Sequence, residues 1–348
     1  MATPVTIAID AMSGDHGLHT TVPAALAALA EFPQLHLLLV GDQAQIRAAL
    51  GSPQAGLAAR LGIEHASEVV GMDEPPSKAL RNKKDSSMRV AINRVKEGRA
   101  QAAISAGNTG ALMATARFVL KTLPGIDRPA IVSSIPAANG HIHMLDLGAN
   151  VECSAEHLFQ FALMGAALVT ALEGVERPRI ALLNIGAEEI KGNDTIKQAA
   201  ALIQASSLNY AGFVEGDGIF FADVDVVVAD GFAGNIALKT GEGVAKLITH
   251  FMREAFGRNP FTRLAALAAL PVLRVLGRRI DPRLHNGATF LGLNGIVIKS
   301  HGGADVLAFT NAIRVAVREV EHDVPSRISR LIPAVAPVPA TTPGTPPA

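Results

Sequence analysis

Short apolar runs recur along the chain and alternate with segments of helical periodicity. The runs, of five to seven residues, are 5–9, 35–40, 102–106, 130–135, 143–147, 179–185, 224–230 and 295–300. Runs of this length are typical of strands buried on both faces. Apolar residues recur at three- and four-residue steps in the segments 19–31, 86–97, 108–121, 155–173, 192–206, 234–256 and 304–321. The alternation predicts an α/β fold with a mostly parallel sheet covered by helices.

Residues 244–283 depart from this alternation and predict a pair of amphipathic helices broken near 257–260. We expect Pro271 to kink or end the second helix, which would then be too short to cross a bilayer but able to lie in its surface. Residues 253–283 contain seven arginines and only two acidic residues, Glu254 and Asp281, which gives a local net charge of +5. Two interpretations remain open. The pair is a dimer interface or core-packing element with a basic rim, or it docks on anionic lipid or on an acidic protein that brings an acyl chain. The residues expected to dock are Arg263, Leu264, Leu267, Arg274, Arg278 and Arg279.

Length and composition favour a compact chain of one large α/β domain or two ordinary ones, and we expect a single domain over residues 1–331 with 244–283 as a helical excursion. Hydrophobic residues make up 49% and charged residues 18% of the 348 positions. Basic and acidic residues balance at 31 each, so we expect no general nucleic-acid binding. Cys153 is the single cysteine and the first residues lack a secretory pattern, which predicts a cytoplasmic protein. Residues 332–348, rich in Pro, Ala and Thr, are expected to form a disordered tail.

Polar, glycine-containing loops follow six of the predicted strands. They are 10–17, 105–111, 146–153, 184–194, 229–240 and 299–305. One such loop is unremarkable, because a tight turn from strand to helix favours glycine anyway. Several loops at corresponding strand ends would converge at one edge of the sheet, where helix N-termini attract anions. The sequence therefore predicts a phosphate cradle, with candidate contacts at Asp10, Gly14, Asp15, Asn108, Thr109, Gly110, Gly186, Asn193, Gly234, Lys239, Lys299 and His301.

The common nucleotide and hydrolase signatures are absent from the sequence, which contains no G-x-x-x-x-G-K-[ST], no G-x-G-x-x-G after a strand and no G-x-S-x-G. We therefore predict no ATP, NAD or other cofactor. His141 and His143 would share one face of a strand and could bind metal, but no third ligand stands at a persuasive spacing, so no metal is predicted. Cys153 is expected to be a buried small residue rather than an acyl carrier. His301 is either a ligand contact or a structural cap.

Inorganic phosphate is an attractive ligand because it is already largely dianionic near neutral pH and needs little help from a general base. Attack on an acyl thioester would require a site that holds phosphate and donors that stabilise the tetrahedral oxyanion. Lysines, asparagines and helix N-termini fit both requirements without a catalytic triad.

Seven motifs together resemble the bacterial phosphate acyltransferase family over residues 5–331. They are DAMSGDHG, KKDSSMRVA, SAGNTGALM, LDLGANVEC, LLNIGAEEIKGND, ADGFAGNIALKT and IKSHGGAD. The resemblance implies transfer of a fatty acyl group from acyl carrier protein to inorganic phosphate, giving acyl phosphate for phospholipid synthesis. It also implies a three-layer α/β/α sandwich related to isocitrate and isopropylmalate dehydrogenases, a homodimer, and loose attachment to the inner membrane surface. Ser13 departs from the family motif, in which a second glycine is usual.

By the same resemblance, Lys191 and Asn235 occupy catalytic positions. We expect Lys191 and the loops 105–111 and 230–236 to bind phosphate, and Asn235 to donate to the thioester carbonyl, without a covalent acyl-enzyme. Two alternatives remain: a phosphate acetyl- or butyryltransferase that uses coenzyme A, and a noncatalytic, membrane-recruited scaffold that binds acyl carrier protein through the basic helical pair.

Overall fold

The computed structural model describes residues 4–335, apart from the side chains of residues 278, 280 and 333–335. Its strands are β1 (Val5–Asp10), β2 (Leu35–Gly41), β3 (Leu61–His65), β4 (Ala102–Ser105), β5 (Ala130–Ala137), β6 (Gly140–Leu145), β7 (Arg179–Leu183), β8 (Asn209–Val214), β9 (Val226–Val228), β10 (Ala288–Leu291) and β11 (Ile296–Lys299). The α-helices are α1 (Leu18–Glu31), α2 (Gln43–Leu50), α3 (Ala55–Ala58), α4 (Pro76–Asn82), α5 (Ser87–Lys96), α6 (Thr109–Leu120), α7 (Ala155–Glu173), α8 (Asp194–Gln204), α9 (Gly231–Gly257), α10 (Pro260–Ile280), α11 (Val306–Glu321) and α12 (Val324–Val335). Two 3₁₀ turns, η1 (Gly218–Phe220) and η2 (Pro282–His285), complete the set.

The strands form one eleven-stranded sheet in the order β3-β2-β1-β4-β11-β10-β5-β6-β9-β7-β8. Most neighbouring pairs are parallel, but β11–β10, β10–β5 and β5–β6 are antiparallel. Three reversals of direction separate the block β1–β4 with β11 from the block β6, β9, β7 and β8. The two blocks therefore run in opposite directions. The loops that follow the strands of one block lie at the opposite end of the strands from the loops that follow the other block. The predicted α/β sandwich is confirmed, whereas the expectation that all six polar loops share one edge is wrong.

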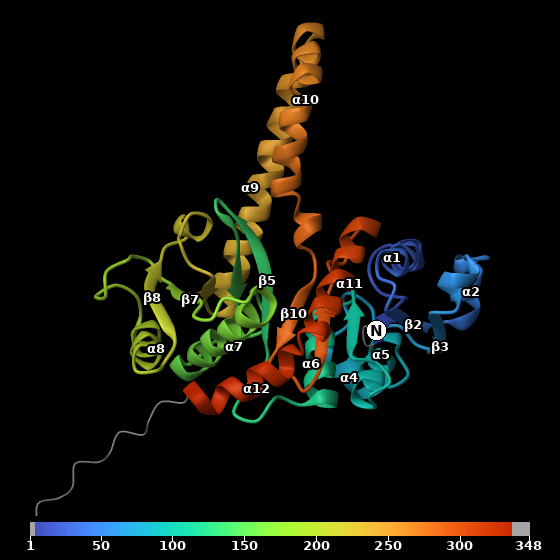
Figure 1. Ribbon diagram of the computed structural model, residues 1–348, viewed down its shortest axis with the longest axis horizontal. Helices are drawn as coiled ribbons and strands as arrows, with labels where there is room; N and C mark the ends of the chain where they lie inside the picture. The colour runs from blue at the N-terminus through green and yellow to red at the C-terminus, as the bar shows by residue number, and fades with distance from the viewer. Residues whose placement is uncertain (1–3, 336–348) are drawn as a thin grey trace, which may run out of the picture.

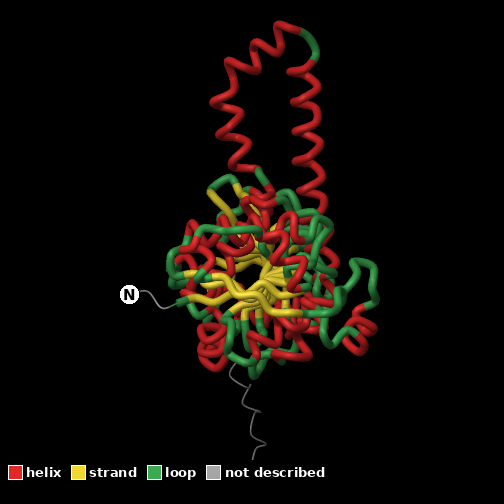
Figure 2. The backbone as a smooth tube through the Cα atoms, turned by 90° about the vertical axis from the view of Figure 1, so that its right-hand side faces the viewer, coloured by secondary structure: helices red, strands yellow, loops and turns green. Residues whose placement is uncertain are grey.

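Helices cover both faces of the sheet, with the strands in the middle layer (Figures 1 and 2). Helices α5, α6 and the start of α9 pack on one face. Helices α1, α11, α7 and α12 pack on the other. The buried side of α11 shows why it lies there, because Phe309, Ala312, Ile313, Ala316 and Val317 recur at helical spacing and are all fully buried.

The apolar pattern missed the two edge strands, the short elements β10, α2, α3 and α4, and the C-terminal helix α12. β3 and β8 form the two edges of the sheet, and β3 has no fully buried residue. An edge strand is covered on fewer sides, so its sequence carries more polar residues and a weaker signal. β10 has only four residues, and α2, α3 and α4 are short.

Helices α9 and α10 form an arm that projects from the sandwich (Figures 1 and 2). The predicted break is confirmed, since α9 ends at Gly257 and α10 begins at Pro260 after its N-cap, Asn259. Pro271 does not end α10, which continues through it to Ile280. Pro271 is exposed on the arm between good helix formers, so the loss of one backbone hydrogen bond does not terminate the helix.

The length of α10 also corrects the expectation that it is too short to span a bilayer. Within residues 4–335, two helices are long and apolar enough to do so by length and composition: α7, which is mostly buried in the core, and the segment Pro260–His285, whose most apolar window has no buried residue. At the C-terminus, α12 runs to Val335, so residues 332–335 of the expected tail are helical. Residues 336–348 lie outside the described chain.

Glu319 of α11 is a carboxyl buried with incomplete hydrogen bonding. Its Oε1 accepts a hydrogen bond from the Thr289 hydroxyl, while Oε2 has no partner among the described residues. Burial raises the pKa of Glu319 to about 7. The protonated form is therefore favoured in the folded state at pH values where the unfolded chain is already ionised.

We expect the contribution of Glu319 to the stability of the protein to fall as the pH rises from about 4.5 to 7, by up to about 1.4 kcal/mol per pH unit. The folded state retains the Glu319 proton over this range and the unfolded state does not, so a higher pH favours unfolding. Glu319→Gln should remove this contribution, and its stability relative to wild type should increase with pH in urea unfolding at pH 5 and pH 8. An unchanged difference between the two proteins at both pH values would contradict the assignment.

Candidate active site

Three loops at the carboxyl ends of β1, β4 and β11 are tied together by hydrogen bonds. The Ser13 hydroxyl oxygen accepts from the Ala106 backbone N–H at 2.9 Å. The Asp15 N–H donates to the Gly302 carbonyl at 2.8 Å. A Cβ on Gly14, whose φ is 83°, would lie 2.9 Å from that same carbonyl oxygen. The three loops are therefore packed too closely to move independently.

Asp10 lies beneath these loops and holds two of them. The Ser105 hydroxyl donates to its Oδ2 at 2.7 Å, and Ser13 donates to its carbonyl oxygen at 2.9 Å. Burial raises the pKa of Asp10, although the surrounding serine hydroxyls oppose the shift. Because Asp10 is only 2% exposed, its geometry supports a positioning role rather than the predicted contact with phosphate.

Ser13 is accommodated without backbone strain. Within residues 4–335, Lys121 and Asp323 are the non-glycine residues with positive φ, so the position does not require glycine. Its hydroxyl also supplies the bonds to Asp10 and Ala106 that join two loops.

Three helices begin at this group of loops: α1, α6 and α11. Asn108 caps α6, because its Oδ1 accepts from the Ala111 N–H at 2.9 Å while its Nδ2 donates to the Met72 carbonyl at 2.6 Å. Thr109 and Gly110 form the first turn of α6 behind this cap. Their backbone N–H groups, rather than the occupied Asn108 side chain, are the donors that this helix end offers to an anion.

Positive charge gathers over the same loops. Lys299 Nζ donates to the Ala106 carbonyl at 3.3 Å and to the Ser300 carbonyl. Burial lowers the pKa of Lys299 to about 8, with Lys239 adding to the effect and Asp15 opposing it. The pKa of His301 is lowered by burial and then by Lys239 and Lys299. An anion bound among these groups would relieve their mutual repulsion.

A second group of residues lies where α9 begins, at the opposite edge of the sheet. The Gly231 N–H donates to the Asn150 carbonyl at 2.7 Å. A Cβ on Gly234 would lie 1.9 Å from the Asp146 carbonyl oxygen, closer than any side chain allows. Asn235 lies against Gly148, with its amide atoms 3.6 Å from where a Cβ on that glycine would stand. The first turn of α9 is thus fixed on the loop after β6.

The Asp146 carboxylate organises that loop. It accepts from the N–H groups of Ile131 at 2.9 Å, Ala149 at 3.1 Å and Asn150 at 2.6 Å. The Asn150 amide adds a bond at 2.9 Å. Burial nevertheless raises the pKa of Asp146 above its ordinary value. The loop that supports Asn235 is rigid as a result.

Helix α9 connects the two groups. Asn235 and Lys239 are four residues apart and share one face of the helix, about 6 Å apart along its axis. Lys239 is close enough to Lys299 and His301 for their charges to interact. The first turns of α9 therefore carry the Asn235 amide and bring Lys239 close to the cationic loops.

Lys191 lies in an exposed loop after β7, apart from the first group of loops. Its N–H donates to the Glu188 carbonyl at 3.0 Å, and its side chain packs on Gly186. Asn193 caps α8, accepting from the Ile196 N–H at 2.9 Å. Because β7 pairs with β9, this loop and the start of α9 are neighbours at one sheet edge. No hydrogen bond or ion pair among residues 4–335 joins Lys191 to the loops 105–111 or 230–236, so its role remains a prediction.

The sequence pattern did not single out several residues that hold these loops. They are Ser105, Asp146, Asn184, Asp230 and Asp305. Asp230 and Asp305 are the N-caps of α9 and α11, and Asn184 Nδ2 donates to the Gly186 carbonyl at 3.1 Å. A short polar residue directly before a helical pattern is an N-cap signal, which could have identified the two aspartates.

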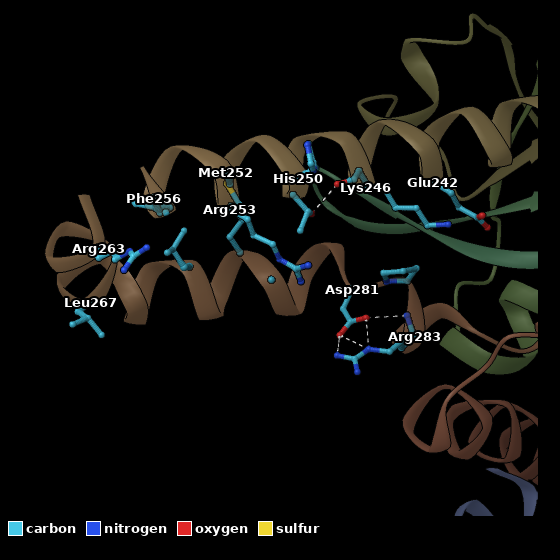
Figure 3. A pocket seen from close by; sticks show the side chains of 18 residues that line it. Glu242, Lys246, His250, Met252, Arg253, Phe256, Arg263, Leu267, Asp281 and Arg283 are labelled. Atoms are coloured by element: carbon cyan, nitrogen blue, oxygen red, sulfur yellow. Dashed lines mark hydrogen bonds and ion pairs between the residues drawn. The ribbon is translucent and has the colours of Figure 1, made fainter. Parts of the chain in front are cut away.

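A groove of about 1100 Å³ runs between α9 and α10 (Figure 3). Basic residues along it include Lys246, His250, Arg253 and Arg263, with apolar contacts from Met252, Phe256 and Leu267. Among the predicted docking residues, Arg263 and Leu267 line this groove. Leu264, Arg274 and Arg279 are exposed elsewhere on α10, and the side chain of Arg278 lies outside the described part of the chain. Where the groove meets the sandwich, Glu242 raises and Lys246 lowers the pKa of His301.

Comparison with solved structures supports the fold. The chain is similar to a phosphotransacetylase from Streptococcus pyogenes, with a TM-score of 0.60 and 16% identity over 91% of this chain and 94% of that one. It is also similar to 4-hydroxythreonine-4-phosphate dehydrogenase from Klebsiella pneumoniae, with a TM-score of 0.53 and 14% identity over 92% and 99% of the two chains. The architecture is thus that of the α/β/α class that includes phosphotransacetylases and these dehydrogenases.

Sequence comparison defines the family. The family described as "Fatty acid synthesis protein" matches residues 5–327. The phosphate acyltransferase of Alkalilimnicola ehrlichii is 63% identical over 330 residues, covering 95% of this chain and 96% of the relative. That of Methylococcus capsulatus is 60% identical over 323 residues, covering 93% and 95%. The chain belongs to the phosphate acyltransferase family, as its motifs predicted, and is an enzyme of that class.

The contact between Gly234 and the Asp146 carbonyl can be tested with a matched pair of variants. Gly234→Ala should destabilise the protein by about 1–3 kcal/mol and reduce turnover, because the added methyl group forces α9 away from the loop that supports Asn235. Gly243→Ala lies on the same helix with open space around it. It should be neutral or stabilise by up to about 1 kcal/mol. Urea unfolding and turnover measure both effects, and equal stability of the two variants would contradict the close approach.

Proposed function

We propose that this phosphate acyltransferase transfers a fatty acyl group from an acyl carrier protein thioester to inorganic phosphate, giving acyl phosphate for phospholipid synthesis. The observation that carries the proposal is the group of bonded loops at three helix N-termini, beside the charges of Lys299 and Lys239 and the imidazole of His301. Family membership supports it, because the relatives' name specifies phosphate and an acyl group.

In this mechanism the loops and cations hold hydrogen phosphate, and one of its oxygens attacks the thioester carbon. Asn235, fixed by Gly148 and the Asp146 loop, donates to the carbonyl oxygen as it becomes an oxyanion. The new acyl–oxygen bond forms, the carbon–sulfur bond breaks, and the proton of the hydrogen phosphate ends on the departing thiol. Lys191 is assigned to phosphate as well, and its exposed loop after β7, which neighbours the start of α9, must move toward the phosphate to bring the lysine there.

Removal of Lys191 tests this assignment. Lys191→Ala should lower phosphate-dependent turnover by about 10²–10³-fold, as expected for a lost charge-stabilising donor, and should leave stability unchanged because the side chain is exposed. The matched control is Lys197→Ala, an exposed lysine of α8 six residues further along the chain. Thioester loss with and without phosphate gives the readout. If the two variants turn over equally, Lys191 has no catalytic role.

Direct attack by phosphate is favoured over an acyl-cysteine because Cys153 is poorly suited to be a nucleophile. It is partly buried, and its Sγ lies 3.5 Å from the Asn150 carbonyl oxygen. Burial, with Asp146 nearby, raises the pKa of its thiol to about 11. A thiolate is the reactive form, and little is present near neutral pH.

Cys153→Ala should therefore retain wild-type turnover within about twofold, since only the thiolate is nucleophilic. Mass spectrometry of the wild-type enzyme during turnover should find no acyl adduct. A folded but inactive Cys153→Ala variant would instead support the acyl-cysteine route.

The carrier protein rather than coenzyme A is proposed as the acyl donor because of the arm. Residues 253–283 carry a local net charge of +5, which suits an acidic protein. Comparing acyl carrier protein and coenzyme A thioesters of one chain length separates the two donors. A higher kcat/KM with coenzyme A would favour the alternative.

We further propose that different parts of the arm contact a second subunit and an anionic membrane surface. Val244, Leu247, Ile248 and Phe251 form an exposed apolar stripe along α9, which suits a second copy in a homodimer. Phe261, Leu264 and Leu267 near the tip of the arm are exposed beside arginines, which suits a charged lipid surface. The enzyme would then be cytoplasmic and peripherally membrane-associated.

Liposome sedimentation tests the membrane contact. Leu267→Glu should reduce the fraction bound to anionic vesicles. The leucine side chain that would insert among the lipids is replaced by a charge of the same sign as the lipid. Phe118→Glu, which places a carboxylate on an exposed apolar position away from the arm, should bind as wild type does. Equal sedimentation of the wild type and Leu267→Glu would count against insertion by this part of α10.

A further inference from the structure

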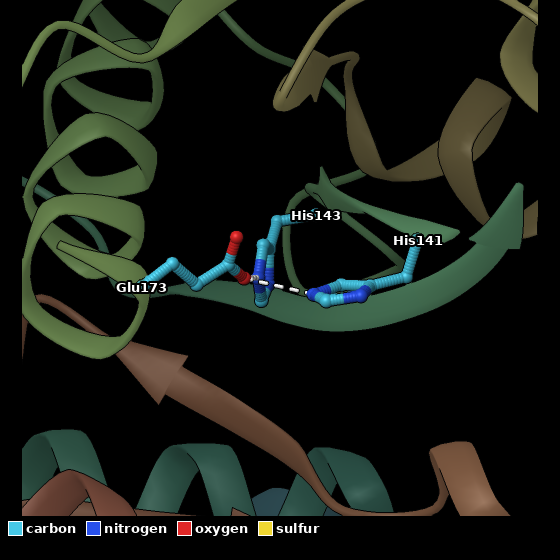
Figure 4. Close-up of side chains that lie close together, drawn as sticks. All are labelled: His141, His143 and Glu173. Atoms are coloured by element: carbon cyan, nitrogen blue, oxygen red, sulfur yellow. Dashed lines mark hydrogen bonds and ion pairs between the residues drawn. The ribbon is translucent and has the colours of Figure 1, made fainter. Parts of the chain in front are cut away.

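His141, His143 and Glu173 converge on the face of the sheet that is covered by α7. The two histidines are alternate residues of β6 and point to the same side, where Glu173 ends α7 (Figure 4). Nε2 of His141 lies 2.8 Å, and Nε2 of His143 lies 2.6 Å, from the same oxygen, Oε1 of Glu173. The three candidate ligand atoms all lie within 4.8 Å of one another.

The catalytic proposal does not use this cluster. Helix α9 packs on the opposite face of the sheet from α7. Histidine spacing alone did not reveal the trio, because its third member is 30 residues from His143 and is brought there by the packing of α7 on β6.

The donor set matches a transition-metal site. Two imidazole nitrogens and one carboxylate oxygen are ligands that zinc accepts, at about 2.0–2.2 Å from the ion. Magnesium and calcium prefer oxygen ligands, so imidazole pairs disfavour them. A zinc ion between the three atoms would need Glu173 to move outward and the two rings to adjust around the ion, because the Glu173 oxygen now lies between the two rings.

Burial divides the cluster into a fixed side and an open side. The His143 side chain is 9% exposed, whereas that of His141 is 40% exposed. A buried ligand restricts the geometry, and an exposed one leaves a path for the ion and room for water as a further ligand. The nearby charged and titratable groups are Arg318 of α11, which opposes a cation, and His285 of η2, which can remain neutral.

We propose that His141, His143 and Glu173 form a binding site for a divalent transition-metal ion, for which zinc is the best match. The ion joins the β5–β6 hairpin to the C-terminal end of α7. The metal binds the unprotonated nitrogen of each ring, so protons compete with it and binding weakens at acidic pH.

Calorimetric titration of the chelator-treated, full-length enzyme with zinc chloride tests the site. The wild type should bind one zinc equivalent per chain that His141→Gln, His143→Gln and Glu173→Gln each lose, while magnesium chloride gives no such equivalent. His322→Gln, which removes a histidine outside the cluster, should retain it. Cobalt(II) should add a visible absorption band to the wild type that the three variants lack.

Circular dichroism and thermal unfolding show whether each variant is folded, and His141→Gln is the safest of the three because its side chain is the most exposed. Loss of the zinc equivalent in a folded His141→Gln protein would support the proposal. No saturable zinc uptake by the wild type, or an equal stoichiometry in His141→Gln and His322→Gln, would overturn it and leave a hydrogen-bonded trio only.

Discussion

The approach of α9 to the loop after β6 determines where the candidate catalytic groups lie. Gly231 and Gly234 let the backbone of the first helical turn touch Asn150 and Asp146, with no space for a Cβ at Gly234. This contact sets the height and rotation of a helix of 27 residues, about 40 Å long. Asn235 and Lys239 are carried on that helix, and so is the arm beyond them. A shift at the first turn would therefore move the site and the arm together.

Because strand direction reverses in the centre of the sheet, the two groups of loops lie at opposite ends of the strands, and α9 is the element that connects them. The loops after β1, β4 and β11 leave one edge, and those after β6, β7 and β9 leave the other. Helix α9 starts among the second set and passes the first, where Lys239 interacts with Lys299 and His301. Asn235 and Lys239 are thus brought towards the loops where α6 and α11 begin, and the first turn of α6, at Thr109 and Gly110, offers N–H groups to an anion. The groups proposed to bind phosphate and to stabilise the oxyanion therefore come from both halves of the sheet rather than from one end of its strands.

Much of the fold was predictable because buried strands and long amphipathic helices leave strong periodic signals. The eight predicted strands, the α11 pattern around Phe309 and the break between α9 and α10 all follow from such signals. Edge strands β3 and β8 were missed because they are less buried, and the antiparallel pairs because strand direction is set by long-range packing. The motifs identified the loops, but not that Asp10 is buried beneath them or that Asn108 is a helix cap. Nor could spacing place Glu173 beside two distant histidines.

The central claim, that the loops at the N-termini of α6 and α11 bind phosphate, is tested most directly by following backbone amide resonances during a titration with inorganic phosphate. The account predicts saturable shifts concentrated in residues 105–111 and 299–303, with weaker ones near Lys239. Sodium chloride at matched ionic strength should not reproduce them. Absence of saturable shifts, or shifts confined to the arm, would contradict it.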